Sequence, residues 1–169
     1  SIANLVNLEY LILESMSLEG PIPDEICSLI NLKSIQIGNN LDISGTIPAD
    51  IGNLVNLKDL SVYNNSLTGS IPEGIGNLVN LEKLVFSGND LTGNIPDGIG
   101  NLVKLTELQF AKNEFSGMVP DTLNNLSSVV YLALNDNHFN ELNSLSGMSA
   151  LNTLSIYNNN FTFEDIEGN

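Results

Sequence analysis

The feature that most constrains this chain is a repeat of 24 residues. The stretch 57–72, LKDLSVYNNSLTGSIP, is matched 24 positions later by 81–96 and again by 105–120, with leucine, asparagine and proline in the same slots. A fixed period of this length is typical of a solenoid, in which each unit buries its apolar side only against its neighbours. The repeat therefore predicts an elongated stack of coils rather than a globule with one central core.

Each unit can be written as Leu-x-x-Leu-x-Leu-x-x-Asn-x-Leu, then Gly-x-Ile-Pro, then a return through Ile-Gly-Asn-Leu. The Leu-x-Leu part alternates with a period of two, which predicts a short strand with its leucines facing inward. Successive strands are joined by long crossovers rather than hairpins, so we expect them to stack in parallel. The units expected from this pattern centre on Met16, Asn40, Asn65, Asn89, Asn113, Asn137 and Asn159.

The units depart from the pattern in places that bear on domain organisation. The second holds one extra residue before Ile47, the sixth lacks Gly-x-Ile-Pro, and the seventh comes early. Residues 1–8 match residues 50–57, so the chain opens in mid-repeat, and we interpret it as part of a longer protein. We predict a single repeat domain over 1–169, with 162–169 as the start of a C-terminal cap.

Three residue types within the repeat have a mechanical interpretation. The recurrent asparagine can donate to and accept from backbone groups that leave the sheet without partners, and stacked units would align these amides into a ladder. Pro favours an extended residue before it and a helical or 3₁₀ turn after it, where an acidic residue gains from the helix dipole. The acidic residues in question are Asp24, Asp50, Glu73, Asp97 and Asp121, and the phenylalanines expected in the core are Phe86, Phe110, Phe115, Phe139 and Phe161.

Composition excludes several kinds of partner. The chain has 5 Lys and Arg against 20 Asp and Glu, a formal charge of −15, whereas nucleic acid and anionic membranes are bound through basic residues. No apolar run has the length of a membrane-spanning helix, so we expect no direct membrane insertion.

Chemistry-bearing motifs are missing. The single cysteine, Cys27, takes the slot of a glycine in later units, and we expect it to be a small residue beside the core. It lies several units from the single histidine, His138, so the two cannot form a nucleophile–base pair. The sequence has no zinc cluster, EF-hand or phosphate loop. We therefore predict no catalytic residue, no metal and no cofactor, while glycosylation at the sequons of Asn64, Asn125 and Asn160 stays open.

The x positions of the predicted strands point away from the core and line up between units. All 4 tyrosines fall in these columns, and Tyr is favoured in recognition because it combines apolar area with a polar tip. Cross-strand packing alone could also favour Tyr and Val here. The candidate ligand-binding residues are Tyr10, Ile12, Lys58, Tyr63, Lys83, Val85, Gln109, Tyr131 and Tyr157.

These motifs resemble those of the leucine-rich repeat family. Leu67–Pro72, LTGSIP, and Leu91–Pro96, LTGNIP, resemble its plant-specific subclass, found in receptor-kinase ectodomains. The resemblance implies an α/β solenoid, a right-handed superhelix of horseshoe shape with a parallel sheet on the concave face, a short second strand, and a 3₁₀ or irregular convex side. The paired-cysteine caps of plant members are absent, and residues 159–166 resemble the closing segment of bacterial surface repeat proteins, so a microbial surface protein is our favoured source.

The residues and the resemblance together predict a non-enzymatic recognition module of a secreted or cell-surface protein. Its ligand would be a protein or peptide on the concave face. The alternative is a polysaccharide or another extended surface such as ice, which regular columns of Asn, Ser, Thr and Tyr could bind.

Overall fold

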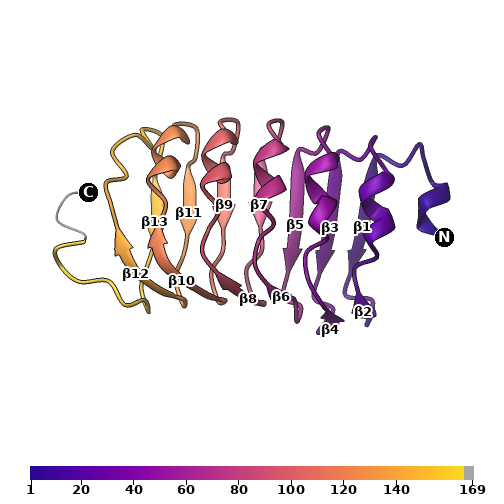
Figure 1. Ribbon diagram of the computed structural model, residues 1–169, viewed down its shortest axis with the longest axis horizontal. Helices are drawn as coiled ribbons and strands as arrows, with labels where there is room; N and C mark the ends of the chain where they lie inside the picture. The colour runs from indigo at the N-terminus through magenta and orange to yellow at the C-terminus, as the bar shows by residue number, and fades with distance from the viewer. Residues whose placement is uncertain (166–169) are drawn as a thin grey trace.

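The computed structural model describes residues 1–165, which form a row of coils with the N-terminus at one end and the C-terminus at the other (Figure 1). One face, the first sheet, is a 7-stranded parallel sheet within the described residues, its strands stacked in chain order. Its members are β1 (Tyr10–Glu14), β3 (Ser34–Gly38), β5 (Asp59–Tyr63), β7 (Lys83–Val85), β9 (Glu107–Gln109), β11 (Tyr131–Ala133) and β13 (Thr153–Ser155). The predicted solenoid of parallel strands is confirmed.

A second layer of parallel strands runs along the lower edge of the row in Figure 1. In residues 1–165 it consists of a 4-stranded and a 2-stranded sheet, linked by one isolated bridge between Thr46 and Thr68. The strands are β2 (Glu19–Pro21), β4 (Asp42–Ser44), β6 (Thr68–Gly69), β8 (Asp90–Gly93), β10 (Glu114–Val119) and β12 (His138–Leu142). β12 pairs with β10 although its unit lacks Gly-x-Ile-Pro, because Leu142 takes the buried place of the isoleucine.

A 3₁₀ helix follows each Ile-Pro or Val-Pro step and forms the return on the other side of the core. Pro is the N-cap residue in η2 to η6, with backbone ψ between 131° and 142°. An acidic residue occupies each first turn, as predicted. The helices are η1 (Ile2–Asn4), η2 (Asp24–Ser28), η3 (Ala49–Asn53), η4 (Glu73–Asn77), η5 (Asp97–Asn101) and η6 (Asp121–Asn125).

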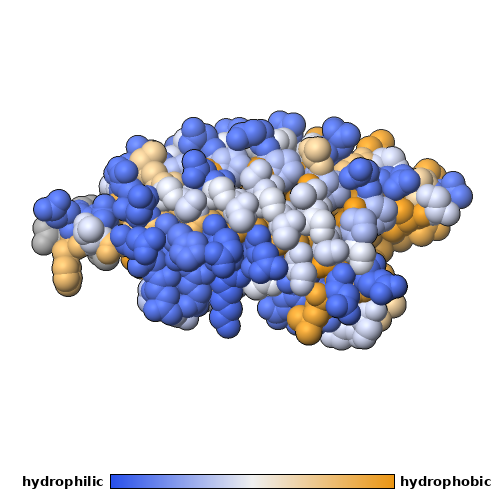
Figure 2. All heavy atoms as spheres, turned by 60° about the horizontal axis from the view of Figure 1, so that its bottom comes forward, coloured by the Kyte–Doolittle hydropathy of each residue, from blue (hydrophilic) through white to orange (hydrophobic). Residues whose placement is uncertain are grey.

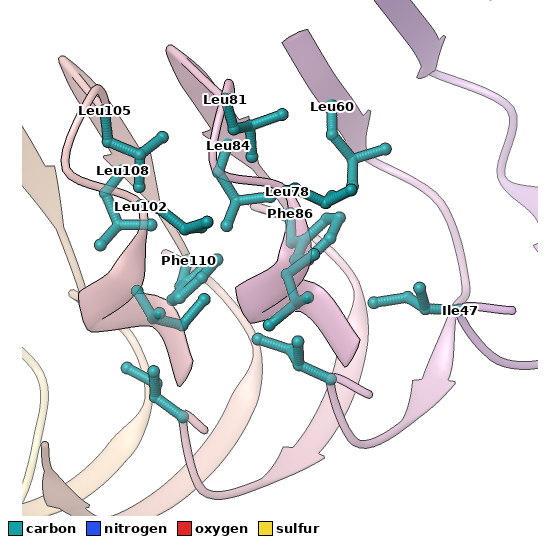
Figure 3. Close-up of a cluster of buried hydrophobic side chains, with 14 of the residues drawn as sticks. Ile47, Leu60, Leu78, Leu81, Leu84, Phe86, Leu102, Leu105, Leu108 and Phe110 are labelled. Atoms are coloured by element: carbon teal, nitrogen blue, oxygen red, sulfur yellow. The ribbon is translucent and has the colours of Figure 1, made fainter. Parts of the chain in front are cut away.

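The core lies between the first sheet and the 3₁₀ helices, and each coil contributes the same set of apolar residues to it (Figure 3). Phe86 and Phe110 stack with centroids 5.8 Å apart, and Phe115 continues the column to Phe139 at 6.2 Å. These four rings are fully buried, as predicted. Phe161, also predicted to be core, is only partly buried because the coil beyond Phe139 has fewer neighbours.

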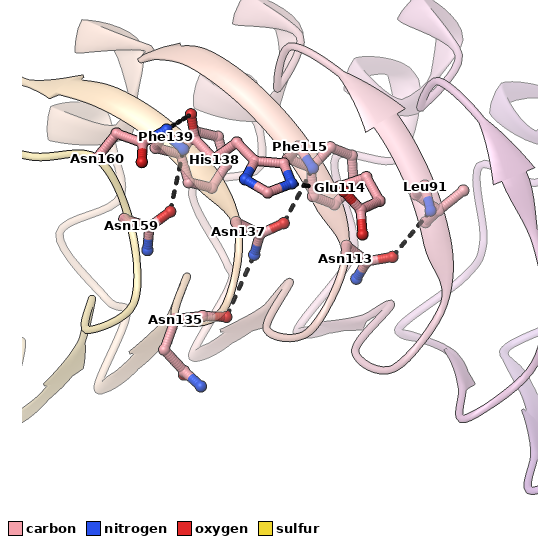
Figure 4. Close-up of polar contacts among 10 residues, drawn as sticks. All are labelled: Leu91, Asn113, Glu114, Phe115, Asn135, Asn137, His138, Phe139, Asn159 and Asn160. Atoms are coloured by element: carbon pink, nitrogen blue, oxygen red, sulfur yellow. Dashed lines mark hydrogen bonds and ion pairs between the residues drawn. The ribbon is translucent and has the colours of Figure 1, made fainter.

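The recurrent asparagines form the predicted ladder between coils (Figure 4). Asn113 is typical: its Oδ1 accepts from the Leu91 N–H at 3.1 Å, and its Nδ2 donates to the carbonyls of Phe86 and Phe110 at 3.0 and 3.1 Å. Asn137 repeats this pattern one coil later. Each amide therefore ties the turn of its own coil to the coil before it.

Each first-sheet strand is followed by a residue in the left-handed region, a regularity that the repeat pattern alone does not predict. Gly88 has φ 71°, and the other members of this row have φ between 51° and 57°. They are Ser15, Asn39, Asn64, Lys112, Asp136 and Asn158. Gly, Asn and Asp tolerate this conformation best, so the row explains why such residues recur where the chain leaves the sheet.

The two ends of the row are less covered than its middle. The inward leucines of the first coil, Leu8, Leu11 and Leu13, are only partly buried, and Figure 2 shows hydrophobic side chains at that end. At the other end, Thr162 donates its N–H and hydroxyl to the Asp165 carboxylate, both at 2.6 Å. The remainder of the predicted cap lies outside the described residues.

Candidate functional site

The outward face of the first sheet carries an open trough of about 300 Å³. It runs across β1, β3, β5, β7 and β9 rather than along one strand. Its lining residues are Glu14, Gln36, Asp59, Ser61, Tyr63, Lys83, Val85 and Gln109. Tyr63, Lys83, Val85 and Gln109 belong to the predicted set, so the structure brings these four together in one site.

Tyr63 forms the wall of the trough at the end nearest β1. Its ring lies over Gly38, so closely that a Cβ at that glycine would come within 2.5 Å of the Tyr63 Cζ atom. The ring thereby reaches across β3 to β1, where its hydroxyl donates to Glu14 Oε1 at 2.8 Å. This hydrogen bond to Glu14 raises the pKa of Tyr63 above its usual value. The side chain is half-buried and held in one orientation.

Asp59 is the centre of a second group of contacts. Gln36 Nε2 donates to Asp59 Oδ2 at 2.8 Å, and Ser61 Oγ donates to Oδ1 at 2.5 Å. Asp59 and Lys83 are adjacent in register between β5 and β7. However, Lys83 pairs with the other neighbour, Glu107, at 3.1 Å, and Gln109 also donates to Glu107. The trough therefore contains two fixed polar groups, one on each side of Val85.

Val85 corrects one expectation. We expected it to be an exposed apolar contact on this face, but it is only 6% exposed. It still lines the trough, so it forms the floor between taller neighbours. Ser61 and Ala133, in the same column of the sheet, are buried in the same way.

Lys58 does not lie in the trough. It comes one residue before β5, at the rim, where its Nζ pairs with Glu82 at 3.0 Å. Lys33 occupies the same rim position one coil earlier and pairs with Glu9 at 2.7 Å. These lysines, which their place in the sequence suggested as contact groups for a ligand, are therefore paired with carboxylates of adjacent coils.

The other predicted residues lie along the same sheet beyond the trough. Tyr10 and Ile12 are exposed on β1, Tyr131 is half-buried on β11, and Tyr157 is exposed just after β13. The trough residues that the prediction omitted are Glu14, Gln36, Asp59 and Ser61. They stand in the outward columns of neighbouring units, so their position in the repeat could have identified them as part of this face. Their residue types gave no such indication.

Cys27 and His138 offer no catalytic pair. Cys27 is buried in η2, where burial, with the carboxylates of Asp50 and Asp24, raises the pKa of its thiol to about 11. A neutral thiol is a weak nucleophile at physiological pH. His138 begins β12 and contacts Glu114 Oε2 at 2.5 Å. In residues 1–165 no group of three or more His, Cys, Asp or Glu side chains is placed to hold a metal ion.

A strongly hydrophilic edge borders the sheet where its strands end. Figure 2 shows it over the C-terminal half of the molecule, on the side where β8, β10 and β12 begin. Asp90, Glu114 and His138 are exposed there, and the Asp136 carboxylate accepts from Asn158 and Asn135. These two amide donors, helped by Lys112, lower the pKa of Asp136.

None of the helices described in residues 1–165 is long and apolar enough to cross a membrane.

Comparison with known proteins assigns the family to which this fold belongs. Residues 7–29, 56–78 and 80–102 match the family described as Leucine Rich Repeat. The ectodomain of SOBIR1, a receptor kinase of Arabidopsis thaliana, is 31% identical with a TM-score of 0.71, and the match covers 75% of this chain and 68% of that one. The chain belongs to the leucine-rich repeat family, and its repeats are of the plant-specific type.

Two longer receptors are also similar. The ectodomain of the Arabidopsis thaliana membrane receptor kinase GASSHO1/SCHENGEN3, solved with CASPARIAN STRIP INTEGRITY FACTOR 2, is 36% identical with a TM-score of 0.89 over 95% of this chain. The Arabidopsis receptor kinase HAESA, solved with the peptide hormone IDA and the co-receptor SERK1, is 29% identical with a TM-score of 0.90 over 95%. The chain spans only 19% and 27% of their lengths. No curated protein matches the chain in sequence.

Proposed function

We propose that this chain is a non-enzymatic recognition module that binds a protein or peptide in the trough on its first sheet. The observation that carries the proposal is the trough itself. It is an open hollow of about 300 Å³ that crosses five adjacent strands, with fixed polar groups on both sides of an apolar floor. A few placed polar groups around an apolar surface are what orients a bound ligand.

Similar proteins support this assignment. HAESA is described in complex with a peptide hormone and GASSHO1/SCHENGEN3 with an integrity factor, and both are receptor kinases. Ligand recognition by an ectodomain takes place outside the cell, so we propose an extracellular or cell-surface location for this chain. The exposed Tyr10 and Tyr157, at opposite ends of the sheet, extend the surface that a longer ligand would contact.

Selection of peptides tests the proposal. A random library of peptides about nine residues long, longer than the trough, would be panned against the immobilised chain. Affinities of the enriched peptides would then be measured for the wild type and for Gln109→Trp, which fills the trough. We expect Gln109→Trp to weaken binding about tenfold or more, a loss of about 1.4 kcal/mol.

Asn101→Trp is the matched control, because it adds the same bulk at an exposed position at the end of η5 on the opposite side of the coil. Equal binding of the peptides to both variants, or a library from which no peptide is enriched, would contradict binding in the trough. The glycan alternative makes a different prediction: soluble oligosaccharides would bind the chain, and loss of a single stacking tyrosine such as Tyr131 would abolish binding.

A further inference from the structure

We propose that the trough takes an extended peptide that presents lysine or arginine side chains to Glu14 and Asp59. This inference rests on the proposed function and adds the chemical class of the ligand. Its starting point is the distribution of charge on one face of the sheet, where some carboxylates have a cationic partner and others do not.

Three carboxylates on this face and its rim are neutralised by a lysine of an adjacent coil. The pairs are Glu9–Lys33 at 2.7 Å, Glu82–Lys58 at 3.0 Å and Glu107–Lys83 at 3.1 Å. They are regular cross-strand pairs of the kind that stabilise a sheet modestly. Most of the negative charge around the trough is thus already balanced within the protein.

Glu14 and Asp59 are the exceptions. Neither has an ion-pair partner among residues 1–165. Their hydrogen bonds come from neutral donors, Tyr63 to Glu14 and Gln36 and Ser61 to Asp59. Such bonds orient the carboxylates without cancelling their charge, so the trough keeps two fixed negative charges, Glu14 at the end of β1 and Asp59 at the start of β5, in a protein whose formal charge is −15.

A buried hydroxyl in the same part of the sheet also lacks a partner. Ser34 lies beside Asp59 in register and therefore on the same side of the sheet. It is 7% exposed, and its Oγ makes no hydrogen bond with any residue in the described part of the chain. An unpaired buried hydroxyl is unfavourable, because its hydrogen bonds to water are lost without replacement. Unmet hydrogen-bonding capacity and uncompensated charge therefore coincide next to Asp59.

The remaining surface of the trough suits the stem of a long basic side chain. Lysine and arginine carry several methylene groups below the charged head, and these pack against apolar surface. Val85 supplies an apolar floor, and the fixed ring of Tyr63 supplies an aromatic wall over which a cation is also favoured. Glu14 and Asp59 would each receive a basic head group.

The spacing of the strands suggests the length of the ligand. Adjacent strands lie about 4.8 Å apart, so the path from β1 to β9 is roughly 19 Å, or about six residues of extended peptide. Tyr131 on β11 is in register with Asp59 and lies three strands beyond it, roughly 14 Å, which is about four residues along such a peptide. A peptide with a basic and an apolar residue at that separation, in either order, would contact the carboxylate with one and Tyr131 with the other.

The test uses the peptides selected from the random library. We expect lysine or arginine to be enriched, with an apolar residue about four positions away. Glu14→Gln with Asp59→Asn should weaken binding about tenfold, because the shape is kept and two charges are lost. Raising salt from about 0.1 M to about 1 M, which shortens the Debye length from about 10 Å to about 3 Å, should weaken wild-type binding and have less effect on the double variant.

Glu73→Gln with Asp97→Asn is the matched control. It makes the same two chemical changes at exposed positions in η4 and η5, on the convex side. This variant should change affinity by less than about twofold, since only the long-range field differs. Equal losses in the two double variants would overturn the cationic assignment and leave a general electrostatic attraction.

The two proposals fail in different ways. Peptides without basic residues that still lose affinity in Gln109→Trp would contradict the cationic ligand and leave binding in the trough intact. Basic peptides that bind Gln109→Trp as well as the wild type would contradict the proposed function itself.

Discussion

At the scale of single residues, the recurrent asparagines stabilise the coil more than any exposed contact does. Asn89 and Asn113 are nearly buried, and each satisfies backbone groups on two neighbouring coils. A buried backbone group left without a partner costs about 1–3 kcal/mol. Asn64 stands immediately before the ladder residue Asn65 and is exposed, and its side-chain amide donates to the Asn39 side chain at 2.9 Å rather than to buried backbone groups. Two adjacent asparagines thus have very different energetic weight.

We therefore expect Asn113→Ala to lower the free energy of unfolding by roughly 3 kcal/mol or more. Asn64→Ala should cost about 1 kcal/mol, mainly because alanine resists the left-handed conformation at that position, φ 51°. Urea denaturation followed by circular dichroism measures both. Equal losses for the two variants would show that the ladder does not stabilise the fold as described.

Tyr63 gives a pH-dependent prediction. Its pKa is raised chiefly because its hydroxyl donates to Glu14. The bond requires the protonated phenol, so its contribution is complete below the unfolded pKa of about 10 and is lost as pH rises through the higher folded pKa. Gly38→Ala forces the ring away, since its Cβ would meet Tyr63 Cζ at 2.5 Å. One tyrosine should then ionise at lower pH than in the wild type.

Absorbance of tyrosinate during alkaline titration measures this shift, and Tyr63→Phe identifies which step belongs to Tyr63. The wild type should show a late-titrating group that the Phe variant lacks. Superimposable titration curves for the wild type and Gly38→Ala would contradict the placement of the ring over Gly38.

At the scale of elements, the 3₁₀ helices η3, η4 and η5 pack closely against the next turn, and a glycine at one position in each of these three makes this possible. In η4, a Cβ at Gly76 would lie 2.7 Å from the carbonyl oxygen of Gly98 in η5. A Cβ at Gly74, in the same helix, would meet nothing closer than 3.7 Å. Cys27 and Asn124 occupy the equivalent place in η2 and η6, so that slot accepts a side chain in the turns on either side of the three that carry glycine.

The two glycines of η4 make a matched test. We expect Gly76→Ala to destabilise the protein by about 1–3 kcal/mol, because two coils must separate to admit the methyl group. Gly74→Ala should be neutral or stabilise by up to about 1 kcal/mol, since it restricts only the unfolded chain. Thermal unfolding of both variants measures the difference. A similar loss at Gly74 would show that the helices are not in close contact at Gly76 in particular.

The sequence predicts the elements well because each has a local cause. Alternating leucines define the first strands, Ile-Pro defines the 3₁₀ turns, and the buried phenylalanines follow from their slots. The trough was harder to predict from the sequence, because its shape depends on which outward side chains lie over their neighbours. Tyr63 is part of the wall since Gly38 leaves room for its ring, and Val85 is the floor since taller neighbours surround it. The partners of Lys58 and Lys83 depend on cross-strand register and rotamer, which period alone does not specify.

At the scale of the whole molecule, stability is distributed along one dimension. Inward leucines such as Leu84 and Leu108 in the middle coils have no exposed surface, while Leu11 and Leu13 of β1 are only partly buried. In a solenoid each coil is held by its two neighbours, so coils at the ends are held by fewer contacts. Local opening is therefore expected to begin at the ends of the row rather than in the centre.

Hydrogen exchange measures this gradient. Amides of β1 and β13 should exchange at least about 100-fold faster than those of β7 and β9, because opening a terminal coil exposes less apolar surface. Mass spectrometry of peptides from each coil would resolve the order. Uniform protection along the row would indicate that the coils unfold as one cooperative unit.

The amide ladder has a consequence for how such a protein can change. Because Asn113 and Asn137 make equivalent bonds to the coil before them, an inserted or deleted unit of the same length would find matching partners on both sides. The length of the sheet that we propose as the binding surface can thus be increased or decreased in whole-coil steps of about 5 Å, while the outward columns diversify independently of the buried amides.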